Sequence, residues 1–327
     1  MVAQPDAMAP STALEPAGSA TSRHEALFYE CGDRGFVEGT LALVRRALGS
    51  EAAVLVAVGG ARAAALTEAL GEEAERVCFA DIRAFGRNPA RIIPVWREFA
   101  REHAGACGEA LGITEPAWPG RSAAELSECE RHEALVNLAF DDGPGWYLLC
   151  PYDLDALDDH VIEAARHTHP LLAWDGASYD NRAYPNAHEP PRPFAGVLPP
   201  PRGRARELAF DRGALAELRH AVADWASVSG LGGERTEELV LAVDELASNS
   251  IRHGGGAGTL RWWREEDELL CEVHDGGWIH APLVGRVRPG TDACSGRGVW
   301  LVNQLCDLVQ IRSAPGGSVV RVRKRLP

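Results

Sequence analysis

Two hydrophobic patterns alternate between His24 and about residue 178. Continuous apolar runs, typical of strands that a sheet buries on both faces, occupy residues 26–29, 53–58, 77–80 and 146–150. Segments with helical periodicity or composition lie between them, at residues 36–48, 61–70, 92–103, 126–138 and 155–167. Short strands that alternate with helices predict an α/β domain with a mainly parallel sheet over residues 23–178.

A different pattern begins at residue 206 and continues to residue 327. Two helices are predicted at residues 213–227 and from 234 onward, with glycines at 230–233 between them. Alternating segments at 259–264 and 268–274 flank the charged turn 265–267 and predict a hairpin. A third helix at 296–306 precedes two further strands, 308–312 and 318–325. We therefore expect a second unit of helices and paired strands.

The remaining segments have no such periodicity. Residues 1–22 are rich in Ala, Pro, Ser and Thr, and we expect a disordered tail. Residues 179–205 hold seven of the 21 prolines of the chain. Such a composition predicts a semi-extended linker that forms no packed core and holds the two units apart.

Length, charge and cysteine usage narrow the class of protein. The 327 residues suffice for two domains, and no apolar run is long enough to span a membrane. A net charge of −14 argues against direct nucleic-acid binding but suits a basic protein partner. The chain begins without a signal-peptide pattern, and its eight cysteines are scattered without a C-x-x-C pair. We expect a cytoplasmic protein with reduced thiols.

Lysine is almost absent, since Lys324 is the only one in the chain. A P-loop is therefore excluded, and any phosphate must be held by arginine, backbone N–H groups or a metal ion. The C-terminal strand is locally basic, with Arg321, Arg323, Lys324 and Arg325. We interpret these four residues as a solvated strand face.

The second helix of the C-terminal unit carries a polar stripe beside its apolar face. Glu245, Asn249 and His253 recur at intervals of four residues and so lie one turn apart, and Gly254 ends the helix. Such stripes are common on solvated helices, and by itself this one favours that interpretation.

Two glycine motifs further along the chain reverse that interpretation. Asp275-Gly276-Gly277 follows a strand, and Gly296-Arg297-Gly298 opens a helix. A helix N-terminus without side chains suits phosphates, and the Asp275 carboxylate can accept a hydrogen bond from an adenine amino group. Asn249 suits Mg²⁺, Glu245 lies one turn away as a general base, and residues 281–295 suit a lid.

Residues 206–327 resemble the GHKL (Bergerat-fold) ATPases, and among them the anti-sigma-factor serine/threonine kinases. The Asp-Glu-Leu-Ala-Ser-Asn run around Glu245 matches the family's N-box, Asp275-Gly276-Gly277 its D-x-G motif, and Gly296-Arg297-Gly298 its second glycine box. The resemblance implies an α/β sandwich that binds ATP and Mg²⁺. Its site residues would be Glu245 (general base), Asn249 (Mg²⁺ ligand), Asp275 (adenine anchor), Gly277, Gly296, Arg297, Gly298 and Ser318. Trp278 departs from the family, which often has a further glycine there.

The resemblance also implies a reaction and partners. The protein would phosphorylate Ser or Thr on an antagonist protein and sequester a sigma factor. Two alternatives stay open: a non-catalytic ATP-gated binding protein, and a histidine kinase. The second needs a phosphoacceptor histidine on a long upstream helix, where this chain has a proline-rich segment. His220 is better interpreted as a surface residue. A homodimer is left open.

The N-terminal unit resembles the MEDS sensory domain, which is similar to a degenerate RecA-like fold. The resemblance rests on His24–Tyr29, on Glu130–Asn137 and on Leu149–Asp153. It implies a sensor of small organic molecules, and we expect a ligand near His24, Cys150 and Tyr152. His160, His167 and His169 are ligand or metal candidates, but exposed helix positions explain them better. Gly59-Gly60 resembles a nucleotide turn without its full motif.

Overall fold

The computed structural model describes residues 22–103, 110–140, 146–174, 176–184, 194–290 and 297–327. The expected tail, Gly296, and the end of the expected lid lie outside these ranges. The chain divides into two compact units, Met1–Pro190 and Pro191–Pro327. Within the described ranges no helix is both long and apolar enough to cross a membrane.

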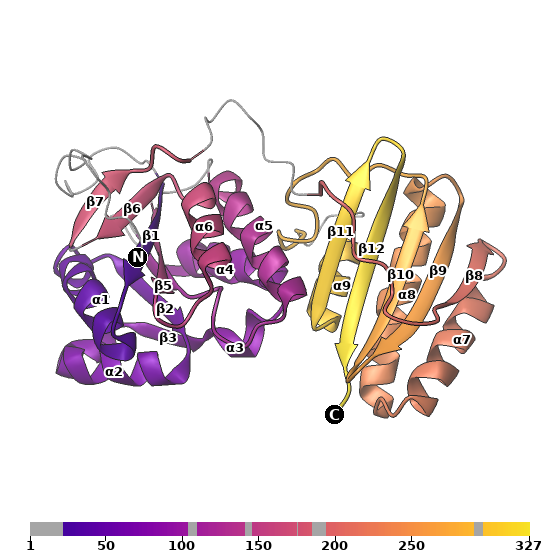
Figure 1. The fold of residues 1–327 in the computed structure, drawn as a ribbon, viewed down its shortest axis with the longest axis horizontal. Coiled ribbons are helices and arrows are strands. Elements are labelled where there is room, and N and C mark those ends of the chain that lie inside the picture. Colours follow the sequence, from indigo (N-terminus) through magenta and orange to yellow (C-terminus); the bar gives the residue numbers. More distant parts are fainter. Residues whose placement is uncertain (1–21, 104–109, 141–145, 175, 185–193, 291–296) are drawn as a thin grey trace. The chain divides into compact units, whose positions relative to one another are not determined.

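The N-terminal unit is built on a seven-stranded sheet in the order β3-β2-β4-β5-β1-β6-β7 (Figure 1). All pairs are parallel except β6 with β7. The strands are β1 (Arg23–Tyr29), β2 (Ala53–Val58), β3 (Cys78–Asp81), β4 (Ala110–Thr114), β5 (Trp146–Asp153), β6 (Leu171–Trp174) and β7 (Ala177–Asp180). The continuous apolar runs are explained by this arrangement, because helices cover both faces of the parallel strands.

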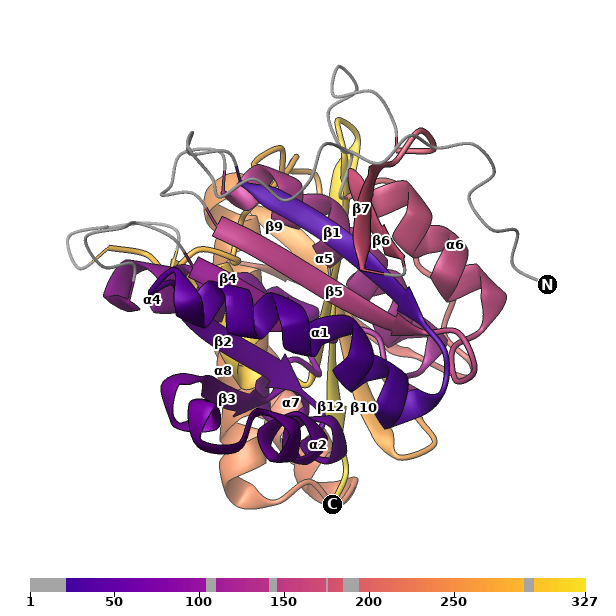
Figure 2. The same cartoon turned by 90° about the vertical axis from the view of Figure 1, so that its left-hand side faces the viewer.

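Helices α1 and α2 cover one face of this sheet, and α3 to α6 lie on the other side of the strands (Figures 1 and 2). Their bounds are α1 (Gly32–Gly49), α2 (Gly60–Leu70), α3 (Ile82–Phe85), α4 (Ile92–His103), α5 (Ala123–Ala139) and α6 (Asp159–Thr168), with short 3₁₀ turns at Gly71–Arg76 and Pro89–Arg91. A full capping box fixes the start of α5, where Ser122 and Glu125 bond each other's backbone N–H groups. The predicted parallel α/β class is confirmed for this unit.

The C-terminal unit has two layers. Its five-stranded antiparallel sheet has the order β11-β12-β10-β9-β8, and the three helices among its described residues pack on one face (Figure 1). The elements are β8 (Arg206–Asp211), α7 (Leu215–Val228), α8 (Gly233–His253), β9 (Ala257–Glu265), β10 (Glu268–Asp275), α9 (Arg297–Leu305), β11 (Leu308–Ala314) and β12 (Gly317–Arg325). The expected α/β sandwich is confirmed.

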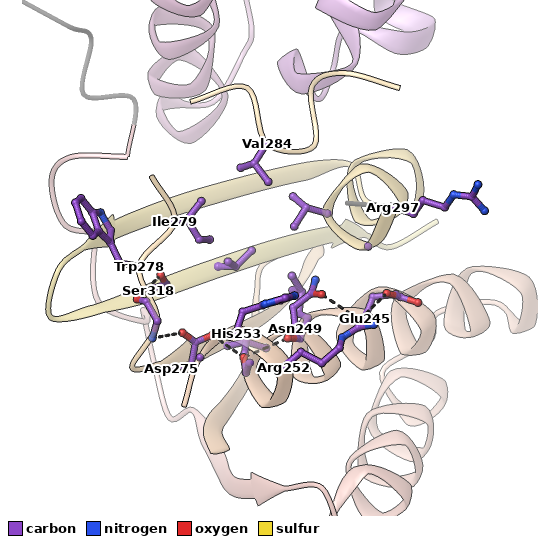
Figure 3. A pocket seen from close by; sticks show the side chains of 18 residues that line it. Glu245, Asn249, Arg252, His253, Asp275, Trp278, Ile279, Val284, Arg297 and Ser318 are labelled. Atoms are coloured by element: carbon purple, nitrogen blue, oxygen red, sulfur yellow. Dashed lines mark hydrogen bonds and ion pairs between the residues drawn. The ribbon is translucent and has the colours of Figure 1, made fainter. Parts of the chain in front are cut away.

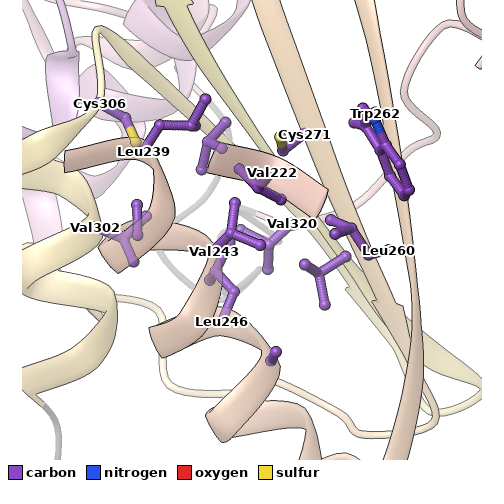
Figure 4. Close-up of a cluster of buried hydrophobic side chains, with 14 of the residues drawn as sticks. Val222, Leu239, Val243, Leu246, Leu260, Trp262, Cys271, Val302, Cys306 and Val320 are labelled. Atoms are coloured by element: carbon purple, nitrogen blue, oxygen red, sulfur yellow. The ribbon is translucent and has the colours of Figure 1, made fainter. Parts of the chain in front are cut away.

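The core of this unit lies between α8 and the sheet (Figure 4). Leu239, Val243 and Leu246 on the apolar stripe of α8 are buried and meet strand residues such as Leu260 and Val320. Burying one such aliphatic side chain contributes about 1.5–3 kcal/mol. Because this stripe is fixed in the core, the polar stripe of the same helix is held in one orientation.

The second half of the expected linker departs from the prediction. Phe194 and Leu198 are each 8% exposed, and Phe194 belongs to the core cluster of the C-terminal unit. The segment crosses the sheet face opposite the helices (Figure 1), where Phe194 accepts a hydrogen bond from Ser313 and Pro199 one from Arg321. The expectation of a segment without a packed core is wrong for residues 194–202, because their apolar side chains and carbonyls complete this sheet face.

The interpretation of the basic C-terminal strand as a solvated face is also wrong. Arg321 is 2% exposed and forms an ion pair with Glu272, with its guanidinium carbon 5.0 Å from the centroid of the Trp263 ring. Lys324, on the other face of β12, is 3% exposed and forms an ion pair with Glu238. Both cations are buried and paired with carboxylates, so they offer no basic surface.

Candidate functional site

The polar stripe of α8 faces a cavity of about 410 Å³ in the C-terminal unit. The cavity is bounded by α8, the end of β10, the segment after it, the start of α9 and β12. Seven of the predicted site residues line it together: Glu245, Asn249, Asp275, Gly277, Arg297, Gly298 and Ser318. Figure 3 shows Glu245, Asn249 and His253 along one helix, with Asp275 beyond its C-terminal end. Residues up to 73 positions apart in sequence therefore share one site.

Asp275 is held rigidly at the floor of this cavity. Its Oδ2 accepts a hydrogen bond of 2.6 Å from the Ser250 hydroxyl, and its Oδ1 accepts one of 2.8 Å from the Gly277 N–H. A carboxylate can accept about four hydrogen bonds, so both oxygens keep capacity for a further donor. Ser250, one position after Asn249 in the N-box, is a site residue that the sequence analysis missed.

Glycines allow the backbone to close around Asp275. A Cβ atom on Gly254 would lie 2.5 Å from Cγ of Asp275, and one on Gly277 would lie 2.9 Å from the carbonyl oxygen of His253. Real Cβ atoms do not approach so closely. The two glycines therefore permit the contact between the end of α8 and the turn after β10, which sets the position of the carboxylate.

A pair of serines secures the segment that follows the D-x-G motif. The Ser318 hydroxyl donates to the carbonyl of Gly277 at 2.8 Å and lies 2.7 Å from the Ser313 hydroxyl, which accepts a hydrogen bond from the Ile279 N–H. Ser318 thus supports the cavity wall from β12. Trp278, which departs from the family pattern, is 55% exposed and lines the cavity edge.

The start of α9 lies directly against the polar stripe of α8. A Cβ atom on Gly298 would lie 2.8 Å from both Oε2 of Glu245 and Nδ2 of Asn249. The Arg297 guanidinium points away from these residues (Figure 3) and donates to the carbonyl of Gly290 at 3.4 Å. The first helical turn therefore meets the stripe through the glycine backbone.

Arg252 is a second residue that the sequence analysis missed. It lines the cavity, and its Nη2 lies 3.1 Å from Oδ1 of Asn249 and 4.0 Å from Oε2 of Glu245. Its position three residues after Asn249 is the signal that could have identified it. Its side chain is 59% exposed, so it can leave the Asn249 oxygen without breaking a buried contact.

The remaining walls of the cavity are apolar. They are formed by Leu246, Val273, Ile279, Val284, Val299 and Val320. A cavity with apolar walls, a fixed carboxylate at one end and a helix N-terminus at the other suits a planar base joined to an anionic group.

The residues predicted for a sensory ligand also come together, in the N-terminal unit. His24 on β1 and Cys150 on β5 lie on adjacent strands, with the Cys150 sulfur 3.5 Å from Nε2 of His24. Glu133 of α5 lies between them and Tyr152, accepting a hydrogen bond of 3.2 Å from the Tyr152 hydroxyl. Glu133 was not predicted as a site residue, although it belongs to the run that carries the MEDS resemblance.

Burial shapes the charges of this cluster. Burial, together with His169, lowers the pKa of His24, and burial with the nearby Glu133 raises the pKa of Cys150 well above its ordinary value. Burial opposes ionisation of Glu133, but His169 and His24 hold its pKa well below the ordinary value. Tyr152 has a raised pKa because of burial and Glu133. The cluster is therefore built around a buried carboxylate whose ionised form is stabilised by two imidazole rings.

A cavity of about 230 Å³ lies beside this cluster. Tyr152 and Glu133 line it, whereas His24 and Cys150 do not. Its other walls are mostly apolar residues of α5 and α6, with Ala117. Of the three residues predicted to bind a ligand, Tyr152 therefore lines the cavity, whereas His24 and Cys150 lie behind Glu133.

We interpreted His160, His167 and His169 as exposed helix residues, and this is wrong for one of them. His160 and His167 have exposed side chains, as expected for helix surfaces. His169 is 0% exposed, and its Nε2 lies 3.4 Å from Oε2 of Glu133. It follows the last residue of α6 and points inward, because the chain enters the sheet at β6 immediately afterwards.

The turn at Gly59-Gly60 is closed by the protein's own side chains. Glu115 Oε2 lies 3.5 Å from the Gly59 N–H, and Arg62 at the start of α2 forms ion pairs with Glu115 and Asp153. Carboxylates at this turn repel phosphate, so the turn does not present a nucleotide site.

Comparisons with known proteins identify both units. Residues 23–170 match the family model of MEDS, the MEthanogen/methylotroph, DcmR Sensory domain. Residues 208–324 match the model of the histidine kinase-like ATPase domain. A search of curated proteins gave no match.

Solved structures with detectable similarity are distant. One contains the RsbU and RsbW domains of Rv1364c from Mycobacterium tuberculosis, at 16% identity and a TM-score of 0.30. The match covers 64% of this chain and 49% of that one, so this chain spans about half of that protein's length. Another is the Acinetobacter baumannii histidine kinase AdeS, at 14% identity and a TM-score of 0.24, covering 38% of this chain and 68% of that one.

The two family matches account for most of the described sequence and leave the segment between them to join the units. The chain therefore combines a MEDS domain at residues 23–170 with a histidine kinase-like ATPase domain at residues 208–324.

Proposed function

We propose that this protein is an ATP-dependent serine/threonine kinase of the anti-sigma-factor type. In this proposal it phosphorylates an antagonist protein, sequesters a sigma factor, and is regulated by a small organic molecule at the MEDS domain. The observation that carries the proposal is the contact of Gly298 with Glu245 and Asn249, because it joins a helix N-terminus to a carboxylate and an amide.

The cavity residues fit ATP and Mg²⁺. ATP supplies the transferred phosphoryl group, and Mg²⁺ offsets the charge of its phosphates. Asp275 accepts a hydrogen bond from the adenine amino group, and the apolar walls enclose the base. The Asn249 oxygen is a hard ligand for Mg²⁺ once Arg252 moves from it, and Arg252 then faces the phosphates. No lysine is required.

Glu245 is placed to act on the substrate hydroxyl. In this proposal its carboxylate takes the proton of the attacking serine or threonine hydroxyl as the new phosphoester bond forms. Its side chain is 30% exposed, so a partner's hydroxyl can reach it. Fixing the proton acceptor one helical turn from the metal ligand is the positioning that phosphoryl transfer requires.

The histidine-kinase alternative receives less support from the described residues. Residues 194–205, directly before the ATPase domain, contain no helix and pack against the sheet. His220 is an exposed residue of α7, within the ATPase domain itself. A phosphoacceptor helix is thus missing from this stretch.

The regulatory part of the proposal concerns the 230 Å³ cavity. A small organic ligand fits a mostly apolar cavity that presents the hydroxyl of Tyr152 and the carboxylate of Glu133. Cytoplasmic location remains part of the proposal. It is supported by six described cysteines, all of which are free thiols.

Phosphotransfer with labelled ATP tests the proposal. The full chain is incubated with candidate antagonist proteins, beside Glu245→Gln and the control Glu237→Gln, which changes an exposed residue of the same helix. Acid-stable label on a partner, lost in Glu245→Gln and kept in Glu237→Gln, is the expected result. Binding of ATP without transfer indicates a binding regulator, and acid-labile autophosphorylation indicates a histidine kinase. Either result contradicts the proposal.

A further inference from the structure

Four buried side chains of the N-terminal unit direct one donor atom each to a common point. The atoms are Nε2 of His24, Oε2 of Glu133, Sγ of Cys150 and Nε2 of His169, and all lie within 4.8 Å of one another. Within the described ranges, no other group of three or more His, Cys, Asp or Glu donors meets this condition. Nitrogen, sulfur and carboxylate oxygen are the ligand types of zinc sites.

Rigid elements hold these donors. His24 lies on β1 and Cys150 on β5, and the register pairs Ala26 with Cys150, so both side chains leave the sheet on the same face. Glu133 comes from the capped helix α5, and His169 follows α6. Four separate segments of chain therefore converge on the point without any contribution from a loop tip.

Hydrogen bonds set the tautomer of both histidines. Nδ1 of His24 lies 3.0 Å from Oδ1 of Asn137, and the Asn137 amide nitrogen donates to the carbonyl of Thr168 at 2.8 Å, so the ring nitrogen is the donor. Nδ1 of His169 donates to the carbonyl of Ala165 at 2.8 Å. Both Nε2 atoms thus present lone pairs to the cluster. A ligand histidine that donates its other N–H to a carbonyl is the usual outer arrangement of a metal site.

In these tautomers the inward nitrogen and carboxylate atoms are all acceptors. Nε2 of His24 is 2.9 Å from Oε2 of Glu133, and Nε2 of His169 is 3.4 Å from the same oxygen. A nitrogen whose proton is on the other side of the ring can only accept, and a carboxylate oxygen also accepts. In the described part of the chain, the fully buried Nε2 of His169 has no hydrogen-bond partner. A metal ion at the centre would bond all of these lone pairs.

Three of the ligand-to-ligand separations agree with tetrahedral coordination. Bonds of about 2.0–2.1 Å to nitrogen or oxygen and about 2.3 Å to sulfur give ligand-to-ligand edges of about 3.3–3.6 Å. The observed edges are 3.4 Å for His169–Glu133, 3.5 Å for His24–Cys150 and 3.6 Å for Cys150–Glu133. The His24–Glu133 edge, at 2.9 Å, is shorter, and the two remaining edges are within 4.8 Å.

We propose that His24, Glu133, Cys150 and His169 bind one divalent ion of the zinc class inside the MEDS domain. The thiol and imidazole donors disfavour Mg²⁺ and Ca²⁺, which prefer oxygen. Glu133 also faces the 230 Å³ cavity, with its Oε1 3.2 Å from the Tyr152 hydroxyl. Only the Glu133 carboxylate therefore separates the ion from the cavity. Binding of the ion or of a ligand in the cavity changes the position of Glu133. This inference does not depend on the kinase activity.

Metal content and cobalt substitution test the site on the full chain. Purified protein is expected to retain about one zinc per chain, and metal-free protein titrated with Co²⁺ should develop the thiolate-to-cobalt charge-transfer band of a tetrahedral site. Cys150→Ser should abolish that band. Asn137→Ala, which removes the outer hydrogen bond to His24 along with bonds to the carbonyls of Thr168 and Glu133, should weaken zinc binding by about 10-fold.

Cys129→Ser is the matched control. Cys129 is a buried cysteine of the same domain, and its thiol donates to the carbonyl of Pro116, which a serine hydroxyl can replace. This variant should keep both the zinc and the band. Wild-type protein with neither zinc nor a cobalt band would overturn the proposal, and so would a band that survives in Cys150→Ser. Chelation should lower the melting temperature of wild type but not of Cys150→Ser, and equal shifts would also count against it.

Discussion

Gly298 lies so close to Glu245 that a Cβ atom at position 298 would be 2.8 Å from the Glu245 Oε2 atom. The same atom would lie 2.8 Å from Nδ2 of Asn249. The side-chain ends that would have to move are those to which we assign the proton and the metal ion. The glycine is therefore required by the site more than by the fold.

Gly298→Ala tests this relationship. The methyl group displaces the ends of two flexible side chains, so we expect a folded protein whose ATP affinity falls about 10-fold, equivalent to about 1.4 kcal/mol. Gly290→Ala is the control, since a Cβ atom there meets nothing within 4 Å. Calorimetric titration with Mg-ATP measures both variants. Unchanged affinity in Gly298→Ala would remove the phosphate role of this turn.

Asn249→Ala tests the magnesium assignment. Loss of the amide oxygen should weaken ATP binding in the presence of Mg²⁺ by about 10-fold or more, or about 1.4 kcal/mol. Binding in the presence of a chelator should change little, because the base contacts remain. Comparing the two conditions by titration isolates the metal-dependent part. An equal loss in both conditions would contradict the role of Asn249 as a metal ligand.

The segment 194–202 should contribute to the stability of the ATPase domain. Leu198 is 8% exposed, whereas its neighbour Val197 is 91% exposed. We expect Leu198→Ala to lower the free energy of unfolding by about 2 kcal/mol, while Val197→Ala changes it by less than about 0.5 kcal/mol. Urea unfolding of the full chain, followed by tryptophan fluorescence, measures the difference. Equal effects would mean that this segment is a linker after all.

The buried ion pair of Arg321 and Glu272 should make the stability of the protein depend on pH. Burial would raise the pKa of Glu272, but hydrogen bonds from His274 and Arg321 hold it below its ordinary value of 4.5. A lowered folded-state pKa contributes stability that is present above pH 4.5 and is lost as the pH falls through the folded value. The contribution should thus be complete at neutral pH.

Glu272→Gln should therefore cost about 3 kcal/mol at neutral pH, since it leaves Arg321 buried without its charge partner. The difference from wild type should shrink in acid, well below pH 4.5. Glu207→Gln, which alters an exposed ion pair with Arg261, should cost less than about 1 kcal/mol. Unfolding curves of the variants and of wild type, at neutral pH and in acid, measure these differences. A difference between Glu272→Gln and wild type that does not change with pH would refute the electrostatic explanation.

Local hydrophobic patterns predicted most of the helices and strands, because each pattern reflects which side chains of that element are buried. The helix at 92–103 and the strand at 53–58 have the predicted bounds. Strand β4 was missed because it has only five residues with a glycine in the middle, although both of its faces are buried. Strand β8 was missed because it is an edge strand whose residues are mostly exposed.

The predictions that failed depend on partners far away in sequence. Arg321 and Lys324 look solvated in isolation, but Glu272 and Glu238 pair with them across the fold. His169 resembles His167 in sequence, and only the entry of the chain into β6 turns it inward. The motifs of the proposed ATP site were recognisable because each motif is local, whereas the proposed metal-ligand cluster assembles from four distant segments.

Selectivity between ATP and GTP tests the central claim most directly, because Asp275 at the floor of the cavity should accept a hydrogen bond from an adenine amino group. Titration of the full chain with each nucleotide in the presence of Mg²⁺ should show at least about 10-fold tighter binding of ATP. Asp275→Asn should lose most of that preference. Equal binding of ATP and GTP by the wild-type protein would contradict the assignment of this cavity as the ATP site.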